Sequence, residues 1–169
     1  MNAILPTLIA WLREYGYPAL WLSIFVAAFG LPLPGFLLLL ASGAISALGD
    51  FNLFLLIPIA FSAAVSGDAL GYLVGRRLGN WLLTWADQKK HPLSGLLPKI
   101  KEARDYFSQR GSWAIFLSRF LFLPLGGPIN MLAGASDYGY RRFVLYDFSG
   151  QLLGALIPLS LGYFFGDSW

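Results

Sequence analysis

The chain has 169 residues, of which 57% are hydrophobic and only 12% are charged. Since an average soluble domain carries about 25% charged residues, this composition excludes an ordinary soluble domain and predicts a membrane protein. The sequence contains no cysteine, which excludes disulfides, cysteine zinc sites and iron–sulfur clusters. The net charge of +3 fits cytoplasmic loops rich in Lys and Arg, and we expect no nucleic-acid partner because the aromatic residues lie in apolar runs.

Two membrane-associated elements are predicted in the first part of the chain. Residues 1–16 place apolar side chains at helical spacing before a charged end, which predicts an amphipathic helix at the membrane interface. Residues 17–49 contain no charged side chain and are broken by two prolines and a glycine in the run Leu31-Pro32-Leu33-Pro34-Gly35. Each half is shorter than the roughly 20 residues that span a bilayer. We therefore expect a re-entrant helical hairpin over 17–49, with a single long kinked helix as the alternative.

A spanning helix is predicted over residues 51–75, where Asp68 is the single charged residue. Four glycines at every fourth position form a stripe that lets another helix approach closely. This stripe consists of Gly67, Gly71, Gly75 and Gly79. We expect the stripe to pack against another helix of the same chain. The alternative is a contact between chains in a homo-oligomer.

The only strongly polar region is the segment 76–111, in which Lys and Arg outnumber Asp and Glu. By the positive-inside rule this segment is cytoplasmic. Its apolar residues recur at helical spacing, which predicts amphipathic helices on the inner membrane surface.

The second half of the chain repeats the first in the opposite orientation. Residues 112–136 are broken at Leu123-Pro124-Leu125-Gly126-Gly127-Pro128 and predict a second hairpin, and residues 143–166 predict a last spanning helix. The run Ser149-Gly150-Gln151 echoes Ser66-Gly67-Asp68. If the basic segment is cytoplasmic, the two hairpins enter from opposite leaflets. We therefore expect an all-α polytopic protein with one membrane domain over 17–169, built from two inverted repeats like those of secondary transporters.

Three motifs occur in the order in which the DedA family carries them, and the chain resembles this family, whose members share the VTT or SNARE-associated domain. The first is the turn with Pro32, Pro34 and Gly35. The second is a glycine-rich run with Gly67, Asp68, Gly71, Tyr72, Gly75 and Arg76. The third combines Arg119, Phe120, Pro124, Gly126, Ala133 and Gly134.

What the resemblance implies is movement of lipids across the bacterial inner membrane. Bacterial members resemble flippases for undecaprenyl phosphate or phospholipids, eukaryotic relatives resemble scramblases, and proton coupling is suspected for some members. The chain departs from the family at three positions. Phe29 and Phe36 stand where many members carry acidic residues, and Leu125 stands where many carry a second arginine.

Arg119 is the first candidate for a binding residue. An arginine inside an apolar segment costs roughly 2.5–3.5 kcal/mol on insertion scales, so such residues are usually functional. Its planar guanidinium suits a phosphate headgroup. The alternative is a structural ion pair with Asp68 or Asp147, and we favour Asp68 as a counter-ion over a proton carrier. Asp147 is expected near the membrane interface.

The two turns supply the remaining site candidates. We expect backbone amides of Gly35, Gly126 and Gly127 to be free for an anion at the turns formed with Pro32, Pro34 and Pro124. Tyr72 shares a helix face with Asp68. Asn130 either caps the second arm of the second hairpin or lines the site, and capping is favoured.

An enzyme is the competing class of function. Membrane lipid phosphatases need two histidines, whereas this chain has one, His91, and it carries no zinc cluster or nucleophile elbow. We therefore expect no catalytic residues, metal or cofactor. The expected function is transport of an anionic lipid, first undecaprenyl phosphate and second a glycerophospholipid. A membrane assembly factor without transport is the alternative.

Overall fold

The computed structural model describes residues 4–31, 33–86, 97–120 and 125–166, and all regular secondary structure within them is helical. The all-α prediction is confirmed. The six helices are α1 (Ile4–Phe29), α2 (Gly35–Ala47), α3 (Leu53–Ala86), α4 (Leu97–Ser118), α5 (Gly126–Ala135) and α6 (Tyr140–Gly166).

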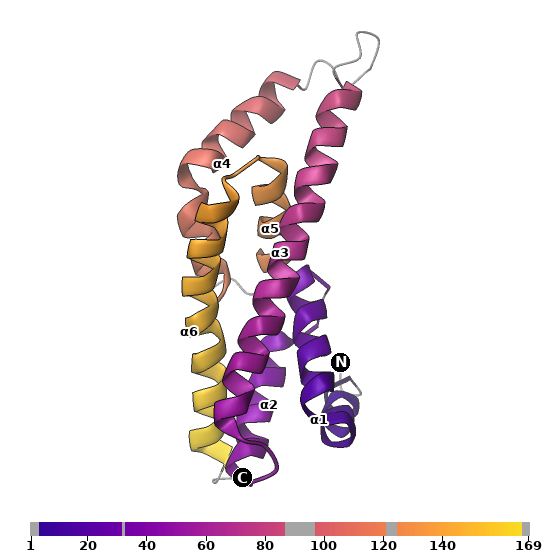
Figure 1. Cartoon of the computed structure of the whole chain (residues 1–169), viewed down its shortest axis with the longest axis vertical. Coiled ribbons are helices and arrows are strands. Elements are labelled where there is room, and N and C mark those ends of the chain that lie inside the picture. The colour runs from indigo at the N-terminus through magenta and orange to yellow at the C-terminus, as the bar shows by residue number, and fades with distance from the viewer. Residues whose placement is uncertain (1–3, 32, 87–96, 121–124, 167–169) are drawn as a thin grey trace.

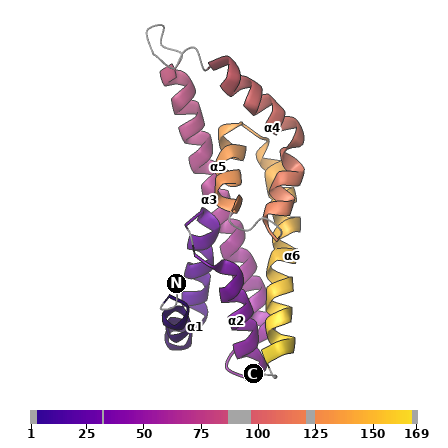
Figure 2. The ribbon, with the colours of Figure 1, turned by 180° about the vertical axis from the view of Figure 1, so that it is seen from behind.

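Helices α3 and α6 run along the length of the molecule, while the shorter helices are divided between its two ends (Figure 1). The pair α1 and α2 lies at one end and the pair α4 and α5 at the other, and the view from behind shows the same division (Figure 2). Two segments, Leu53–Trp81 and Tyr140–Gly166, are long and apolar enough to cross a membrane. The fold therefore consists of two long apolar helices with one helix pair packed at each end.

The first proline-rich turn reverses the chain. Helix α1 ends at Phe29, and α2 begins at Gly35 and returns toward the end from which α1 came (Figure 1). Gly30 begins this turn with a φ of 116°, a conformation that L side chains rarely adopt. The alternative of one long kinked helix over 17–49 is therefore wrong.

Within α1 the backbone changes direction at Gly16, whose φ of 61° and ψ of −138° are not helical. Two helical parts thus meet at the position where the sequence separates the interfacial segment 1–16 from the apolar segment that follows.

Two helix boundaries differ from expectation. Helix α3 continues to Ala86 instead of ending at residue 75, since no proline interrupts the segment that follows Gly75. Helix α4 runs without a break from Leu97 to Ser118 and crosses the expected boundary at residue 111. The basic segment is thus divided between the end of α3 and the start of α4.

The glycine stripe of α3 packs against helices of the same chain. A Cβ atom added to Gly67 would lie 2.8 Å from the Cβ of Ala28 in α1, and one added to Gly79 would lie 2.6 Å from the Cα of Ala135 in α5. Gly75 faces Met131 of α5 in the same way. The packing interpretation is confirmed, because helices of this chain cover these glycines at distances that no larger side chain permits.

Candidate functional site

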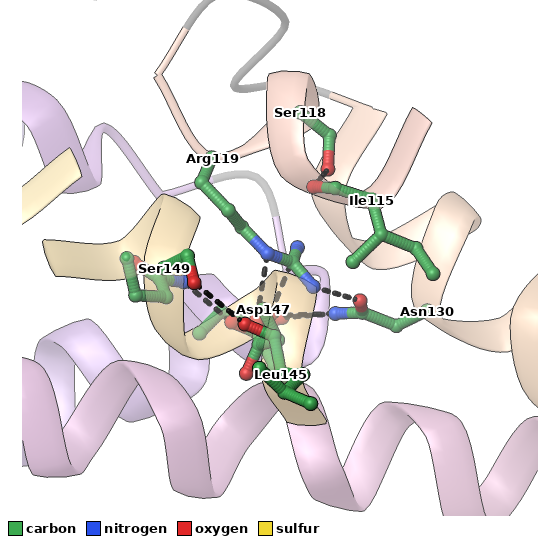
Figure 3. A network of polar contacts seen from close by, with 10 residues as sticks. Ile115, Ser118, Arg119, Asn130, Leu145, Asp147 and Ser149 are labelled. Carbon is green, nitrogen blue, oxygen red and sulfur yellow. Dashed lines mark hydrogen bonds and ion pairs between the residues drawn. The ribbon is translucent and has the colours of Figure 1, made fainter. Parts of the chain in front are cut away.

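Arg119 lies directly after the last residue of α4, and its side chain extends toward α6 (Figure 3). Its backbone amide donates to the carbonyl of Phe116 at 3.3 Å, which tightens the end of the helix. Two glycines of α6 make room for it. A Cβ atom added to Gly150 would lie 2.7 Å from the Cγ of Arg119, and one added to Gly154 would lie 2.7 Å from its carbonyl oxygen.

The guanidinium of Arg119 is buried and binds one polar side chain from each of three helices. Its Nε lies 2.7 Å from Oδ1 of Asp147 in α6, and its Nη1 lies 3.4 Å from Oδ1 of Asp68 in α3. Its Nη2 donates to Oδ1 of Asn130 in α5 at 2.6 Å (Figure 3). The sequence left open an ion pair of Arg119 with Asp68 or with Asp147, and the structure has both.

The two carboxylates are held differently. Asp68 accepts a hydrogen bond from the amide of Asn130 at 2.6 Å on Oδ1 and another from the amide of Gln151 on Oδ2. For Asp147, among the described residues, Arg119 is the only ion-pair partner, and neither carboxylate oxygen accepts a hydrogen bond of good geometry. Asp68 is thus fixed by two amides, whereas within the described residues Asp147 is held by its ion pair with Arg119. We name these five residues, Asp68, Arg119, Asn130, Asp147 and Gln151, the ionic cluster.

A layer of aromatic residues lies beside the ionic cluster. The ring of Phe143 lies 6.0 Å from Cζ of Arg119, within the range of a cation–π contact. Tyr72 packs against Phe143 with ring centroids 4.7 Å apart, and its hydroxyl donates to the carbonyl of Tyr138. The hydroxyls of Ser112 and Tyr138 lie 2.6 Å apart. Tyr72 is thus connected to Arg119 through an aromatic ring rather than by a polar contact.

The two turns meet beside the cluster. A Cβ atom added to Gly30 would lie 3.1 Å from the Cα of Gly127, so the backbones of the first and second turn are in contact. Gly126 lies next to Arg119, because its added Cβ would be 3.4 Å from Nη1. The turn after α1 and the start of α5 therefore converge on the arginine.

Residues of the first turn contribute less than expected. The amide of Gly35 donates to the carbonyl of Leu33 at 2.9 Å, so the expectation that it is free for an anion is wrong. The nearest atom to an added Cβ at Gly35 belongs to Ala27 of the same helix pair. Pro34 precedes α2 as its N-cap residue. Pro32, Pro124 and His91 lie outside the described residues.

The expectation for Asn130 is corrected. Asn130 does not cap α5, because the N-cap is Leu125 and no side chain caps it. Its side chain instead joins Arg119 to Asp68 and also reaches the carbonyl of Ala28 at 3.5 Å. Asp147 lies inside the protein, with only 1% of its surface exposed.

Gln151, Gly30 and Phe143 are site residues that the sequence did not indicate as such. A signal for Gln151 was present, since the internal repeat aligns it with Asp68 and the two side chains are hydrogen-bonded 83 residues apart. The position of Gly30 becomes apparent only from the contact between the two turns.

The described residues include two apolar helices long enough to cross a membrane and a buried arginine–carboxylate cluster, a pattern typical of helical membrane proteins. The VTT domain matches residues 33–164, which is most of the chain. The chain therefore belongs to the VTT-domain family, to which the DedA proteins belong.

Relatives are membrane proteins of bacteria. An uncharacterized membrane protein of Synechocystis sp. is 38% identical over 91% of this chain and 69% of its own length. An uncharacterized membrane protein of Haemophilus influenzae is 31% identical over 92% of this chain and 73% of its own length. Protein DedA of Escherichia coli K12 is 32% identical over 79% of this chain, a match that covers 60% of DedA. No solved structure matches the chain.

Proposed function

We propose that this protein moves an anionic lipid across the bacterial inner membrane, with undecaprenyl phosphate as the first substrate and a glycerophospholipid as the second. The observation that carries the proposal is the buried guanidinium of Arg119 between two apolar membrane-spanning segments. A buried cation in such a position is costly and marks a pathway for an ion or substrate. The lipid is bound and released without chemical change.

The contacts of Arg119 support recognition of a phosphate. A planar guanidinium binds carboxylates and phosphates with the same geometry of paired N–H donors. The carboxylate of Asp147, 2.7 Å from Nε, occupies the place of such an anion. A phosphate headgroup can therefore take over the contact that Asp147 makes in this structure.

Asp147 rather than Asp68 is the carboxylate that the headgroup displaces from Arg119. Two amide donors hold Asp68, so moving it breaks three polar contacts, whereas moving Asp147 breaks one. Displacement of Asp147 leaves Arg119 attached to Asn130 and Asp68 and frees its Nε edge. We therefore assign Asp147 the role of a carboxylate that substitutes for the headgroup in the empty site.

The charge of the cluster supports proton coupling. Two carboxylates and one guanidinium leave one negative charge in a buried place when all three groups are ionised. A proton on either carboxylate makes the cluster neutral, and a headgroup that enters adds further negative charge. Uptake of a proton together with the lipid compensates for this charge.

The pattern of helix contacts supports two inverted repeats with re-entrant hairpins. An added Cβ at Gly43 of α2 would lie 3.0 Å from the carbonyl carbon of Leu159 in α6, and one at Gly75 of α3 would lie 2.6 Å from the Cα of Met131 in α5. Each hairpin thus packs its second arm against the long helix of the other repeat. Asp68 and Gln151, which the repeat aligns, touch each other, as residues near a two-fold axis do.

On this proposal the described conformation is a closed state, because Arg119 is only 4% exposed. Access requires that the two helix pairs part where Gly30 contacts Gly127. Since the pairs lie at opposite ends of the molecule, opening either one exposes the cluster to one side of the membrane.

Translocation in liposomes tests the proposal. Fluorescent polyprenyl phosphate and fluorescent phosphatidylglycerol are followed with purified wild type, Arg119→Lys and the control Arg142→Lys, which changes an exposed residue. We expect transport by wild type and control, and a rate lower by about tenfold or more for Arg119→Lys, since lysine retains the charge but loses the paired donors. Absence of transport with and without a proton gradient, or equal rates for both variants, contradicts the proposal.

A further inference from the structure

A groove runs along the first third of α6 on the outside of the molecule. It has a volume of about 450 Å³ and is lined by Tyr140, Arg141, Val144, Leu145, Phe148 and Ser149. This volume lies within the range of roughly 300–1,000 Å³ found for small-ligand sites. The groove is separate from the ionic cluster, because Leu145 and Phe148 are 67% and 50% exposed whereas Asp147 between them is buried.

The groove has one charged end and an apolar body. Arg141 is exposed at the start of α6, and within the described part of the chain no carboxylate lies within ion-pair distance of it. The walls are Val144, Leu145 and Phe148, with Phe61 of α3 packed edge-on against Phe148 at 4.5 Å. At the end opposite Arg141, the hydroxyl of Ser149 donates to the carbonyl of Leu145 at 2.8 Å, so its hydrogen is already used in a bond.

The dimensions match one leaflet of a bilayer. Nine residue steps along a helix, from Tyr140 to Ser149, measure about 14 Å at 1.5 Å per residue. The hydrocarbon core of a bilayer is roughly 30 Å thick, so one leaflet measures about half of that. A lipid whose headgroup lies at Arg141 can thus lay an acyl chain along the whole groove.

We propose that this groove binds an anionic glycerophospholipid of the leaflet at the Arg141 end, with its phosphate at Arg141 and one acyl chain against Val144, Leu145 and Phe148. The charge of Arg141 selects an anionic over a zwitterionic headgroup, and the apolar walls select a lipid over a free phosphate. The site does not depend on transport, since it needs only that α6 spans the membrane.

Spin-labelled lipids test the site on the purified full chain in nanodiscs. The motionally restricted fraction is measured for phosphatidylglycerol and for phosphatidylcholine with wild type, Arg141→Gln and Leu145→Trp. Two variants at exposed positions of α6 outside the groove, Arg142→Gln and Leu153→Trp, are the matched controls. Circular dichroism checks that all variants remain helical.

We expect wild type to prefer phosphatidylglycerol and Arg141→Gln to lose this preference by about fivefold, the factor equivalent to about 1 kcal/mol for one basic residue at an anionic membrane surface. Leu145→Trp fills the groove and lowers the restricted fraction of both lipids, while the two controls behave as wild type. Equal losses for Arg141→Gln and Arg142→Gln mean a diffuse surface charge and overturn the proposal. A restricted fraction unchanged by both groove variants overturns it as well.

Discussion

At the scale of single residues, the protein places one arginine among polar groups from three helices in an apolar environment. Removing one partner of such a buried pair costs about 3–5 kcal/mol, because the other charge is left unpaired. Arg119→Ala would leave Asp68 and Asp147 without their shared cation. Loss of activity in that variant therefore does not separate folding from binding, and conservative substitutions are more informative.

Asp147→Asn is expected to increase the affinity for an anionic lipid, whereas Asp68→Asn is not. The first variant weakens the closest ionic contact of Arg119, at 2.7 Å, and frees its Nε edge for a phosphate. A charge-assisted hydrogen bond is worth about 1.5–3 kcal/mol, which corresponds to about tenfold or more. Titration of each purified variant with fluorescent polyprenyl phosphate measures the effect. Equal affinities for the two variants would contradict the assignment of Asp147 as the carboxylate that the headgroup displaces.

Gly150→Ala is expected to displace Arg119, since the added methyl group would lie 2.7 Å from its Cγ. The translocation rate should fall as in Arg119→Lys although every charged residue remains. Gly139→Ala is the matched control, because nothing lies within 4 Å of its added Cβ. Wild-type transport by Gly150→Ala would show that the fit of Arg119 against α6 is unimportant.

At the scale of helices, close backbone contacts at glycines hold the second arm of each helix pair to a long helix. Gly43 and Gly162 serve the contact of α2 with α6, and Gly75 and Gly134 serve the contact of α5 with α3. Small residues are favoured at such contacts because the apolar solvent of a membrane gives no hydrophobic force between helices. Dispersion forces at short range then supply the attraction.

Gly134→Ala is expected to destabilise the protein by about 1–3 kcal/mol or more, the usual cost of overpacking. Its added Cβ would overlap the carbonyl oxygen of Tyr72, which as helix backbone cannot move aside. The change in free energy of unfolding is measured in detergent by equilibrium denaturation. Gly139→Ala, in open space, should remain within about 0.5 kcal/mol of wild type. A neutral effect of Gly134→Ala would mean that the α3–α5 contact is looser than the structure has it.

The ion pair of Arg76 with Asp137 is expected to contribute little to stability. The two side chains are 47% and 54% exposed, and their atoms lie 3.1 Å apart. Exposed pairs are worth about 0–1 kcal/mol. Arg76→Gln should thus shift the unfolding midpoint in detergent only slightly, and a loss comparable to that of Gly134→Ala would refute this expectation.

Some of these features could be predicted from local sequence and others could not. Two prolines and two glycines within six residues end a helix, whereas the single prolines Pro18, Pro58 and Pro158 lie inside helices, so the turn between Phe29 and Gly35 was foreseeable. The burial of Asp147 was not foreseen, because Arg141 and Arg142 just before it suggested the interface. Its spacing from Phe143 and Gly150 nevertheless puts it on the buried face of α6. The role of Asn130 depends on where α5 meets α3, which local pattern does not reveal.

At the scale of the whole molecule, the two helix pairs lie at opposite ends, and charge indicates which end faces the cytoplasm (Figure 1). Arg76, Arg141 and Arg142 are exposed at the end that carries α4 and α5. Asp50 lies at the other end, where α2 leads into α3. From the positive-inside rule we predict that the α4–α5 end is cytoplasmic.

Cysteines at Asp50 and Glu102 should react with impermeant reagents from opposite sides of the membrane. Both residues are exposed, and the chain has no cysteine of its own to give background labelling. Labelling of intact cells and of inverted vesicles measures the orientation. Reaction of both positions from the same side would contradict the inverted arrangement of the two helix pairs.

The central claim is that the ionic cluster is a headgroup site that opens to the two sides of the membrane. The most direct test is the reactivity of Gly126→Cys, whose thiol would lie beside Nη1 of Arg119. In proteoliposomes of known orientation we expect it to react with an impermeant anionic thiol reagent added from either side, and to be protected by polyprenyl phosphate. No reaction from either side, or reaction that the lipid leaves unchanged, would contradict the claim.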